Sequence, residues 1–366
     1  MSTELVEPSA VPAVVGRYDT LKTFASAVLE KVGVPAADAA DAADVLVWAN
    51  LSGVDTHGLR NLKRAYVDGV VAGIINPKPE FRIEFETPIT ARVDGDNGLG
   101  LVGGCWAMRL AIAKAEKSGI GLVAMHSSHH FGAAGYFSKM ALPHDMIGIS
   151  MTGYLRAGGS EYGMIPTFGA VPMLSTNPIS MAVPADQEPP FHLDMATTTA
   201  PMNRVFLHSE LGKEIPHGWG LDQDLQSTTD PNAVRGLLPL GGTRETGSHK
   251  GYGLAMLVEI LCAQLSGAWA RGEDGNYRQD DNGHFFAALR VDYFRPPDEF
   301  KAAMDGMIDE LHRTPTAPGH DRVLVAGDPE HATRLKRAAE GIPLAPNVVE
   351  DLAALSATYG VPLTLE

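Results

Sequence analysis

The sequence predicts an α/β fold built around a sheet that contains parallel strand pairs. Three segments rich in apolar and β-branched residues, 89–94, 120–125 and 146–151, alternate with segments of helical character at 101–117 and 132–142. This β-α-β-α-β order is typical of domains in which helices cover a sheet. Both ends of the chain show mainly helical spacing, so we expect a helical unit there.

The first eighty residues predict three helices. Apolar residues recur at helical spacing over 18–33, and a second helix is expected over 36–51. Asp55 or Thr56 can cap the free amides of a third helix that continues to about residue 71.

The second half predicts short strands, long loops and one strongly apolar helix. A glycine-rich stretch at 153–176 precedes strands at 179–183 and 191–193. The apolar segment 251–270 contains Glu259 and Gln264, which favours a buried helix over a membrane span. The tail predicts a strand near 285–291, a helix after Pro296-Pro297, a strand at 321–326 and two terminal helices.

Composition excludes several classes of protein. The 366 residues contain 29 Lys and Arg against 44 Asp and Glu, so the net charge of −15 disfavours nucleic acid and anionic membranes as partners. Cys105 and Cys262 lie too far apart for a CxxC metal site, and two cysteines make no disulfide framework. The first twenty residues lack an export signal, so we expect a cytoplasmic protein.

Gly98, Gly100 and Gly103 match the GxGxxG pattern of dinucleotide-binding Rossmann folds, between a predicted strand and a predicted helix. A Rossmann site also needs an acid after the next strand to hold the ribose, and residues 125–128 read MHSS. We therefore interpret these glycines as a close-packed turn.

The segment from Asp55 to Arg64 carries the first candidate chemistry. In a continuous helix His57 would share a face with Arg60 or Asn61 and with Arg64. Arginine can hold a carboxylate through two hydrogen bonds while histidine exchanges a proton with a nearby oxygen, which suits a 2-oxo acid or 2-hydroxy acid. A solvated basic helix face explains the same spacing.

Three further segments are open to more than one interpretation. His126, His129 and His130 follow a predicted strand and can supply an acid/base group, hold a metal in a lyase, or simply bond to loop backbone. Asp194 closes a short strand and can orient an imidazole, bind a ribose or cap a helix. Lys250 stands in GSHKGYG before a helix, where it can hold phosphate. The HExxH, GxSxG and Walker motifs are absent from the sequence, which leaves hydrolases and nucleoside triphosphatases without support.

Six motifs in this order resemble the malate/L-lactate dehydrogenase family, which is distinct from the Rossmann lactate and malate dehydrogenases. They are GVDTHGL (53–59), DGDNGLG (94–100), HHFGAAGYF (129–137), STNPISMAVP (175–184), LDMATT (193–198) and HKGYGLAMLVEIL (249–261). The family includes ureidoglycolate dehydrogenase, diketogulonate reductase and Δ1-piperideine-2-carboxylate reductase.

The resemblance implies a non-Rossmann fold and hydride transfer between NAD or NADP and a small 2-oxo or 2-hydroxy acid. Reduction of a cyclic imino acid is the alternative within the family. It also implies a homodimer with its active site near the subunit interface. We expect a mixed-sheet cofactor-binding domain at 81–296 and a discontinuous helical domain formed by 1–80 and 297–366.

The resemblance also assigns residues. His57 is the expected proton donor, and His130, with Asp194, an expected acid/base group. Expected cofactor contacts, besides His130 and Asp194, are Thr176, Met195, Ala196, Lys250, Gly251, Tyr252, Asn282 and Gly283.

Three positions depart from the family pattern. Asn61 stands where many members carry arginine, so Thr56, Asn61 and either Arg60 or Arg64 are expected to bind the substrate. The loop at 153–165 is longer than usual and can bring Arg156 to the pocket. Asn203-Arg204 replaces a common Gly-Lys pair.

Overall fold

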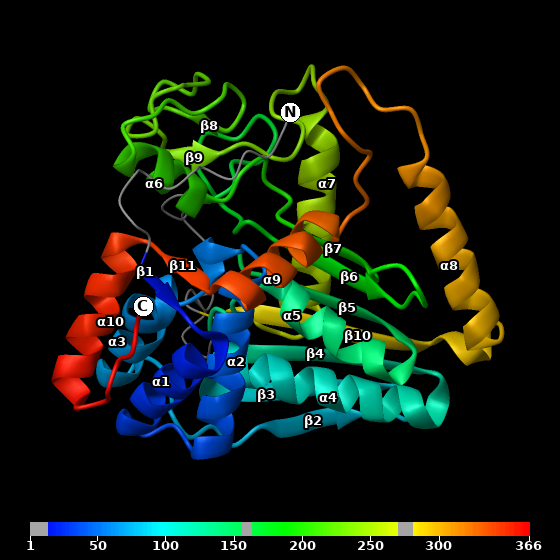
Figure 1. Cartoon of the computed structure of the whole chain (residues 1–366), viewed down its shortest axis with the longest axis horizontal. Coiled ribbons are helices and arrows are strands. Elements are labelled where there is room, and N and C mark those ends of the chain that lie inside the picture. The colour runs from blue at the N-terminus through cyan, green and yellow to red at the C-terminus, as the bar shows by residue number, and fades with distance from the viewer. Residues whose placement is uncertain (1–13, 156–162, 270–280) are drawn as a thin grey trace.

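The computed structural model describes residues 14–155, 163–269 and 281–366, and a seven-stranded mixed sheet lies at its centre (Figure 1). The strand order is β2-β3-β4-β10-β5-β6-β7. The strands span Arg82–Glu86 (β2), Thr90–Gly98 (β3), Ile120–Ser128 (β4), Gly283–Arg290 (β10), Met146–Gly153 (β5), Ile179–Val183 (β6) and Phe191–Met195 (β7).

One parallel pair lies in this sheet. Strands β3 and β4 pair in parallel and are joined by α4 (Gly100–Ser118), which confirms the first predicted β-α-β unit. Strands β4 and β5 run in the same direction but do not pair, because β10 lies between them and is antiparallel to both. The central position buries both faces of a strand, and the apolar sequence of β10 is suited to that position.

The two ends of the chain meet. Strand β1 (Val14–Gly16) pairs antiparallel with β11 (Ile342–Leu344), and the helices α1 (Tyr18–Lys31), α2 (Ala36–Leu51) and α10 (Pro346–Tyr359) gather around them (Figure 1). Helix α9 (Asp328–Glu340) packs against α2. The head helices α1 and α2 therefore contact the tail helices α10 and α9.

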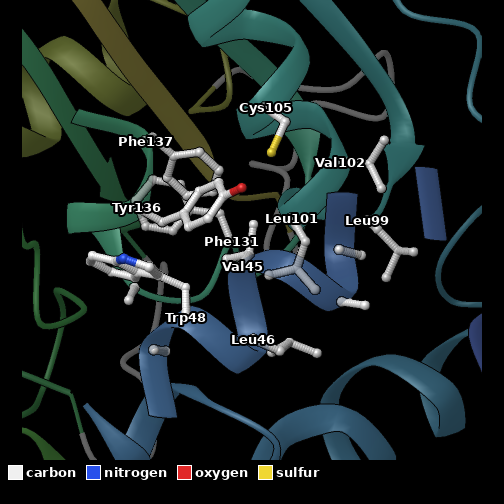
Figure 2. Packing of buried hydrophobic residues seen from close by; sticks show 14 of the residues in the cluster. Val45, Leu46, Trp48, Leu99, Leu101, Val102, Cys105, Phe131, Tyr136 and Phe137 are labelled. Atoms are coloured by element: carbon white, nitrogen blue, oxygen red, sulfur yellow. The ribbon is translucent and has the colours of Figure 1, made fainter. Parts of the chain in front are cut away.

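The main core lies where α2 and α4 meet the loop between β4 and α5 (Ala134–Ser138). Val45 of α2, Leu101 and Cys105 of α4, and Phe131 and Phe137 all point into this layer and are fully buried (Figure 2). The same cluster continues to Phe286 of β10, so one core joins the head helices to the sheet.

Three predicted elements are corrected. Residues 321–326 form no strand, and the helix expected at 132–142 becomes α5 followed by a 3-10 helix, Lys139–His144, that contains Pro143. The predicted third helix is divided into separate pieces. It begins as a 3-10 turn, Asp55–His57, is interrupted at Gly58, and continues as a π-helical segment, Leu62–Val67, and as α3 (Asp68–Val71).

The apolar helix is α7 (Ser248–Glu259), continued by a π-helical turn, Ile260–Gln264, and it is buried on one face only. Leu257 is 44% exposed and Ile260 52%. Within the three described ranges, no helix is long and apolar enough to cross a membrane. The remaining elements are β8 (Gly220–Leu221), β9 (Gly236–Leu237), a 3-10 turn (Val291–Tyr293), α6 (Met202–Glu210) and α8 (Pro297–His312).

Candidate active site

Two imidazoles from distant segments stack on each other. The rings of His57 and His130 lie 5.6 Å apart, centroid to centroid, at 23°. His57 ends the 3-10 turn, and Gly58 follows because a Cβ there would lie 2.1 Å from Oδ1 of Asn50. That oxygen accepts a hydrogen bond from the amide of Leu59 at 2.7 Å, which fixes the turn on α2.

The contacts of His130 define its protonation. Its Nδ1 lies 2.7 Å from the hydroxyl of Tyr66 and accepts from the amide of Gly132 at 3.3 Å. An imidazole nitrogen that accepts from an amide carries no proton, so the Tyr66 hydroxyl also donates to it and the proton resides on Nε2. Burial, with the nearby His57, lowers the pKa of His130 to about 3, and burial lowers that of His57 to about 4. Both rings are neutral at neutral pH.

The residues around His57 fix its backbone and ring. Nδ1 of His57 lies 2.9 Å from Oγ1 of Thr56. The carbonyl of Thr56 accepts hydrogen bonds from the side-chain amides of Asn61 and Asn203, both at 3.0 Å. Asn61 therefore holds the turn that carries His57.

The predicted single face of His57, Arg60 and Arg64 is wrong. Gly58 interrupts the helix, and the π-helical segment after it changes the angle between successive residues. Arg60 forms an ion pair with Glu210 of α6 at 2.8 Å. Arg64 pairs with Asp351 of α10 at 3.3 Å and is 59% exposed.

Asp194 ends β7 and reaches α5. Its Oδ2 accepts a hydrogen bond from the amide of Gly135 at 2.7 Å, and a Cβ at Gly135 would collide with that oxygen. The surrounding protein displaces water from the carboxyl, and Glu330 adds a negative charge; together they raise the pKa of Asp194 to about 7 although the side chain is accessible. Asp194 can exchange a proton near neutral pH.

The three clustered histidines have three different partners. Nε2 of His126 lies 3.0 Å from a carboxylate oxygen of Glu84, and Nε2 of His129 lies 3.1 Å from Oδ1 of Asn97. His130 binds Tyr66. Across the described ranges, no group of three His, Cys, Asp or Glu side chains could hold a metal ion. His126, His129 and His130 therefore do not form a metal site with one another.

The GxGxxG glycines serve close packing, as interpreted. A Cβ on Gly100, the first residue of α4, would lie 2.0 Å from the carbonyl oxygen of His129 and 2.7 Å from that of His130. A Cβ on Gly98 would lie 2.7 Å from the Pro79 side chain. The backbone that carries His130 is thus seated directly on the start of α4.

The expected cofactor residues fall into two groups. In the first, the carbonyl of Thr176 accepts from the amide and hydroxyl of Thr197, at 2.9 and 3.0 Å, next to half-buried Met195 and Ala196. On α7 nearby, Lys250 is exposed, Gly251 packs under the backbone of Leu240, and Tyr252 packs against the cluster of Met164, Leu174 and Ala255.

In the second group, the amide of Asn282 donates to the carbonyl of Ser128 at 3.1 Å, and Gly283 begins β10 opposite Gly153. Both lie beside the strand end that leads to His130. Arg156 lies outside the described residues.

Sequence reasoning missed Tyr66 and His284. His284 stacks on Phe131 at 4.9 Å and 3°, with Nε2 2.9 Å from Oγ of Ser128. Neither residue belongs to a motif or a periodic pattern that would single it out. Their roles arise from contacts between segments distant in sequence.

Comparison with known proteins places the chain among dehydrogenases. Residues 17–353 match the family described as malate/L-lactate dehydrogenase. A malate dehydrogenase of Pyrococcus abyssi is 41% identical over 349 residues, covering 94% of each chain. An L-sulfolactate dehydrogenase of Methanocaldococcus jannaschii is 37% identical over 339 residues, 91% of this chain and 94% of that one. The crystal structure of malate dehydrogenase from Entamoeba histolytica superposes with a TM-score of 0.88 at 35% identity, covering 95% of this chain and 99% of the other. The chain belongs to the malate/L-lactate dehydrogenase family.

Proposed function

We propose that this protein is an NAD(P)-dependent oxidoreductase that interconverts a small 2-hydroxy acid and the corresponding 2-oxo acid. Its relatives are named for malate, lactate and sulfolactate, which share a hydroxyl next to a carboxylate. The observation that carries the proposal is the stacked pair of neutral imidazoles, His57 and His130.

The two histidines have distinct roles. When bound, the nicotinamide cofactor would supply the group that accepts the hydride in oxidation and donates it in reduction. In oxidation, neutral His57 accepts the hydroxyl proton of the substrate, and in reduction it returns that proton to the oxygen. His130, fixed by Tyr66 with its proton on Nε2, donates a hydrogen bond to the reacting oxygen. Asp194 provides the second proton-exchanging group.

Arg60 is the better candidate for the substrate carboxylate. Its guanidinium already holds a carboxylate, that of Glu210, and Glu210 is 46% exposed and free to be displaced. Helix α6 contacts both parts of this segment, since Glu210 binds Arg60 and Asn203 binds the carbonyl of Thr56. Arg60→Ala should raise the KM for the acid by roughly tenfold or more. Arg64→Ala, which breaks only the pair with Asp351, should leave KM nearly unchanged.

The described residues fit a dinucleotide. Lys250 is exposed in the first turn of α7 and has no ion-pair partner in the described ranges, so its ammonium group is available to a phosphate. Asp194 and Thr176 offer oxygen acceptors to ribose or carboxamide. Gly251 and Gly283 pack against the carbonyl oxygens of Leu240 and Cys262, which fixes the backbone of α7 and β10 beside these groups.

We also propose a homodimer that forms across α7. Leu254, Leu257 and Ile260 form an exposed apolar stripe at helical spacing, continuing from Lys250. Leu257→Asp should convert a dimer to a monomer in light scattering, whereas Leu335→Asp, at an exposed leucine of α9, should not. A monomeric parent protein would contradict this proposal.

Three further expectations remain proposals. The division into a helical domain (1–80 with 297–366) and a cofactor domain (81–296) should appear as cleavage near these boundaries in limited proteolysis. The buried free thiols of Cys105 and Cys262 favour the cytoplasm, which fluorescence microscopy of a tagged protein tests. The charge of −15 disfavours nucleic acid, and retention on a DNA column at physiological salt would contradict this expectation.

The deciding experiment follows nicotinamide absorbance with malate, lactate, sulfolactate and ureidoglycolate, offering NAD and NADP separately, and in reverse with 2-oxo acids and cyclic imino acids. His57→Ala should lower kcat by roughly 10²–10⁴ while retaining cofactor binding. His144→Ala, at a half-exposed histidine paired with Glu116, is the matched control. Preference for the cyclic imino acids, or no turnover with any acid, would overturn the proposed reaction.

A further inference from the structure

A carboxyl group that the proposed chemistry does not use is buried under the cofactor segments. Glu259, on α7, is 2% exposed. Its Oε2 accepts a hydrogen bond from Nδ2 of Asn177 at 3.0 Å, and its Oε1 is buried with no hydrogen-bond partner among the residues that the structure describes. No Lys, Arg or His of the described ranges forms an ion pair with Glu259. Such a group is costly to bury, so its position calls for an explanation.

Asn177 connects Glu259 to the loop before β6. Asn177 is fully buried, with a left-handed backbone at φ +40°. Its Nδ2 also donates to the carbonyl of Ala255, one turn before Glu259, at 3.0 Å. Its Oδ1 accepts from the hydroxyl of Ser175 at 2.5 Å. Through these three hydrogen bonds, the side chain of Asn177 connects helix α7 to the loop that contains Ser175 and Asn177.

The same loop is tied to the end of β7. The hydroxyl of Thr197 donates to the carbonyls of Thr176 and Asn177, each at 3.0 Å, and its amide donates to Thr176 at 2.9 Å. Thr197 directly follows Ala196. A single polar network thus joins the three segments that carry Thr176, Asp194–Ala196 and Lys250–Tyr252.

We propose that Glu259 is a positioning residue for the cofactor: through Asn177 it sets the loop of Thr176 and the end of β7 relative to α7. This inference rests on the proposed nicotinamide cofactor. Gly153, at the end of β5, completes the arrangement, because a Cβ there would lie 2.8 Å from Oε2 of Glu259. The Glu259 carboxyl therefore packs closely against strand β5 of the sheet as well as against Asn177.

This arrangement gives cofactor binding a pH signature. Burial raises the pKa of Glu259 to about 7. Among the described residues, the titratable group that interacts with Glu259 is Cys262, one turn later, whose pKa burial raises well above its ordinary value. Its thiol stays neutral near neutral pH, so the group of this network that titrates there is Glu259. Above its pKa an uncompensated buried charge loosens the network, and cofactor affinity should fall.

The test measures the Kd of NADH and NADPH by fluorescence titration between about pH 5.5 and about pH 8.5, a range that brackets a pKa of about 7. In the parent protein Kd should rise roughly threefold to tenfold across this range. Glu259→Gln keeps an oxygen acceptor for Asn177 without a charge, and should bind tightly at every pH. Asn177→Gly tolerates the positive φ but removes the amide, and should weaken binding at every pH. Glu310→Gln, at an exposed glutamate of α8, is the matched control.

Asp194 titrates in the same range, so the comparison is repeated in an Asp194→Asn background, where the remaining pH dependence belongs to Glu259. Thermal denaturation without cofactor, in the same Asp194→Asn background, gives a second readout: as pH rises from about 4.5 to about 7, the protein with Glu259 should lose stability relative to its Glu259→Gln variant. The inference fails if Glu259→Gln retains the parent pH profile of Kd. Failure of the parent protein to bind either cofactor would instead overturn the proposed function.

Discussion

Replacing Gly100 by alanine should damage both the fold and the active site. Gly100 is the first residue of α4, and its Cβ position lies 2.0 Å from the carbonyl oxygen of His129. A comfortable carbon–oxygen contact is about 3.3 Å, so the 129–130 backbone must move by roughly 1.3 Å. That backbone carries the imidazole of His130.

The expected magnitudes follow from this displacement. Overpacking against backbone costs about 1–3 kcal/mol, and alanine gains little at the first position of a helix because it replaces no interior glycine. A misplacement of about 1 Å at a catalytic group lowers turnover by up to roughly 10²-fold. The variant should therefore lose stability and activity together.

Urea denaturation and steady-state kinetics measure the two effects. Gly306→Ala is the matched control, because Gly306 lies inside α8 with open space around its Cβ position. This variant should gain about 0.5–1 kcal/mol and keep full activity. A Gly100→Ala protein with parent stability and parent kcat would refute the assigned seating of His130 on α4.

Three further predictions concern the site and the core. Tyr66→Phe removes the hydroxyl that orients His130. Initial rates should show a kcat lowered roughly threefold to tenfold, and thermal melts should show no loss of stability. An unchanged kcat would contradict the tautomer assigned to His130. The proposed oxidation needs neutral His57, whose pKa is lowered to about 4. The kcat/KM for the hydroxy acid should therefore fall as pH drops through about 4. A fall of kcat/KM near pH 6.5, the ordinary pKa of histidine, would contradict this. The ring of Phe137 is fully buried and stacks on Phe131 at 4.8 Å, so Phe137→Ala should lower the free energy of unfolding in urea by about 3–5 kcal/mol. Phe294 is 80% exposed, and Phe294→Ala should change this free energy by less than about 0.5 kcal/mol. Equal effects of the two variants would refute the assigned core.

Periodicity predicted the elements whose burial is uniform along their length. Strand β6 was predicted at its observed bounds, 179–183, and α4 within a residue at each end, because apolar spacing reports directly which face is buried. It did not predict that β10 lies between β4 and β5. Strand order depends on which apolar strand fills the central position, and this competition involves segments more than a hundred residues apart.

The two stacked histidines were singled out from the sequence, and their surroundings were not. His57 and His130 stand in distinctive motifs, and the structure stacks them. The prediction that Arg60 and Arg64 share a helix face with His57 was wrong because Asn50 inserts its side chain at Gly58. The spacing of residues within 55–64 cannot reveal this contact.

The sequence by itself determined the α/β class, the helical head and tail, the acidic surface and the family, since these depend on composition, local periodicity and ordered motifs. The tertiary structure alone decided the protonation of His130, the partners of the two arginines and the burial of Glu259. Each of these depends on the distance between groups far apart in the chain. Burial and hydrogen bonding act only at close range, so the chemistry of a side chain is fixed by the neighbours that folding brings to it.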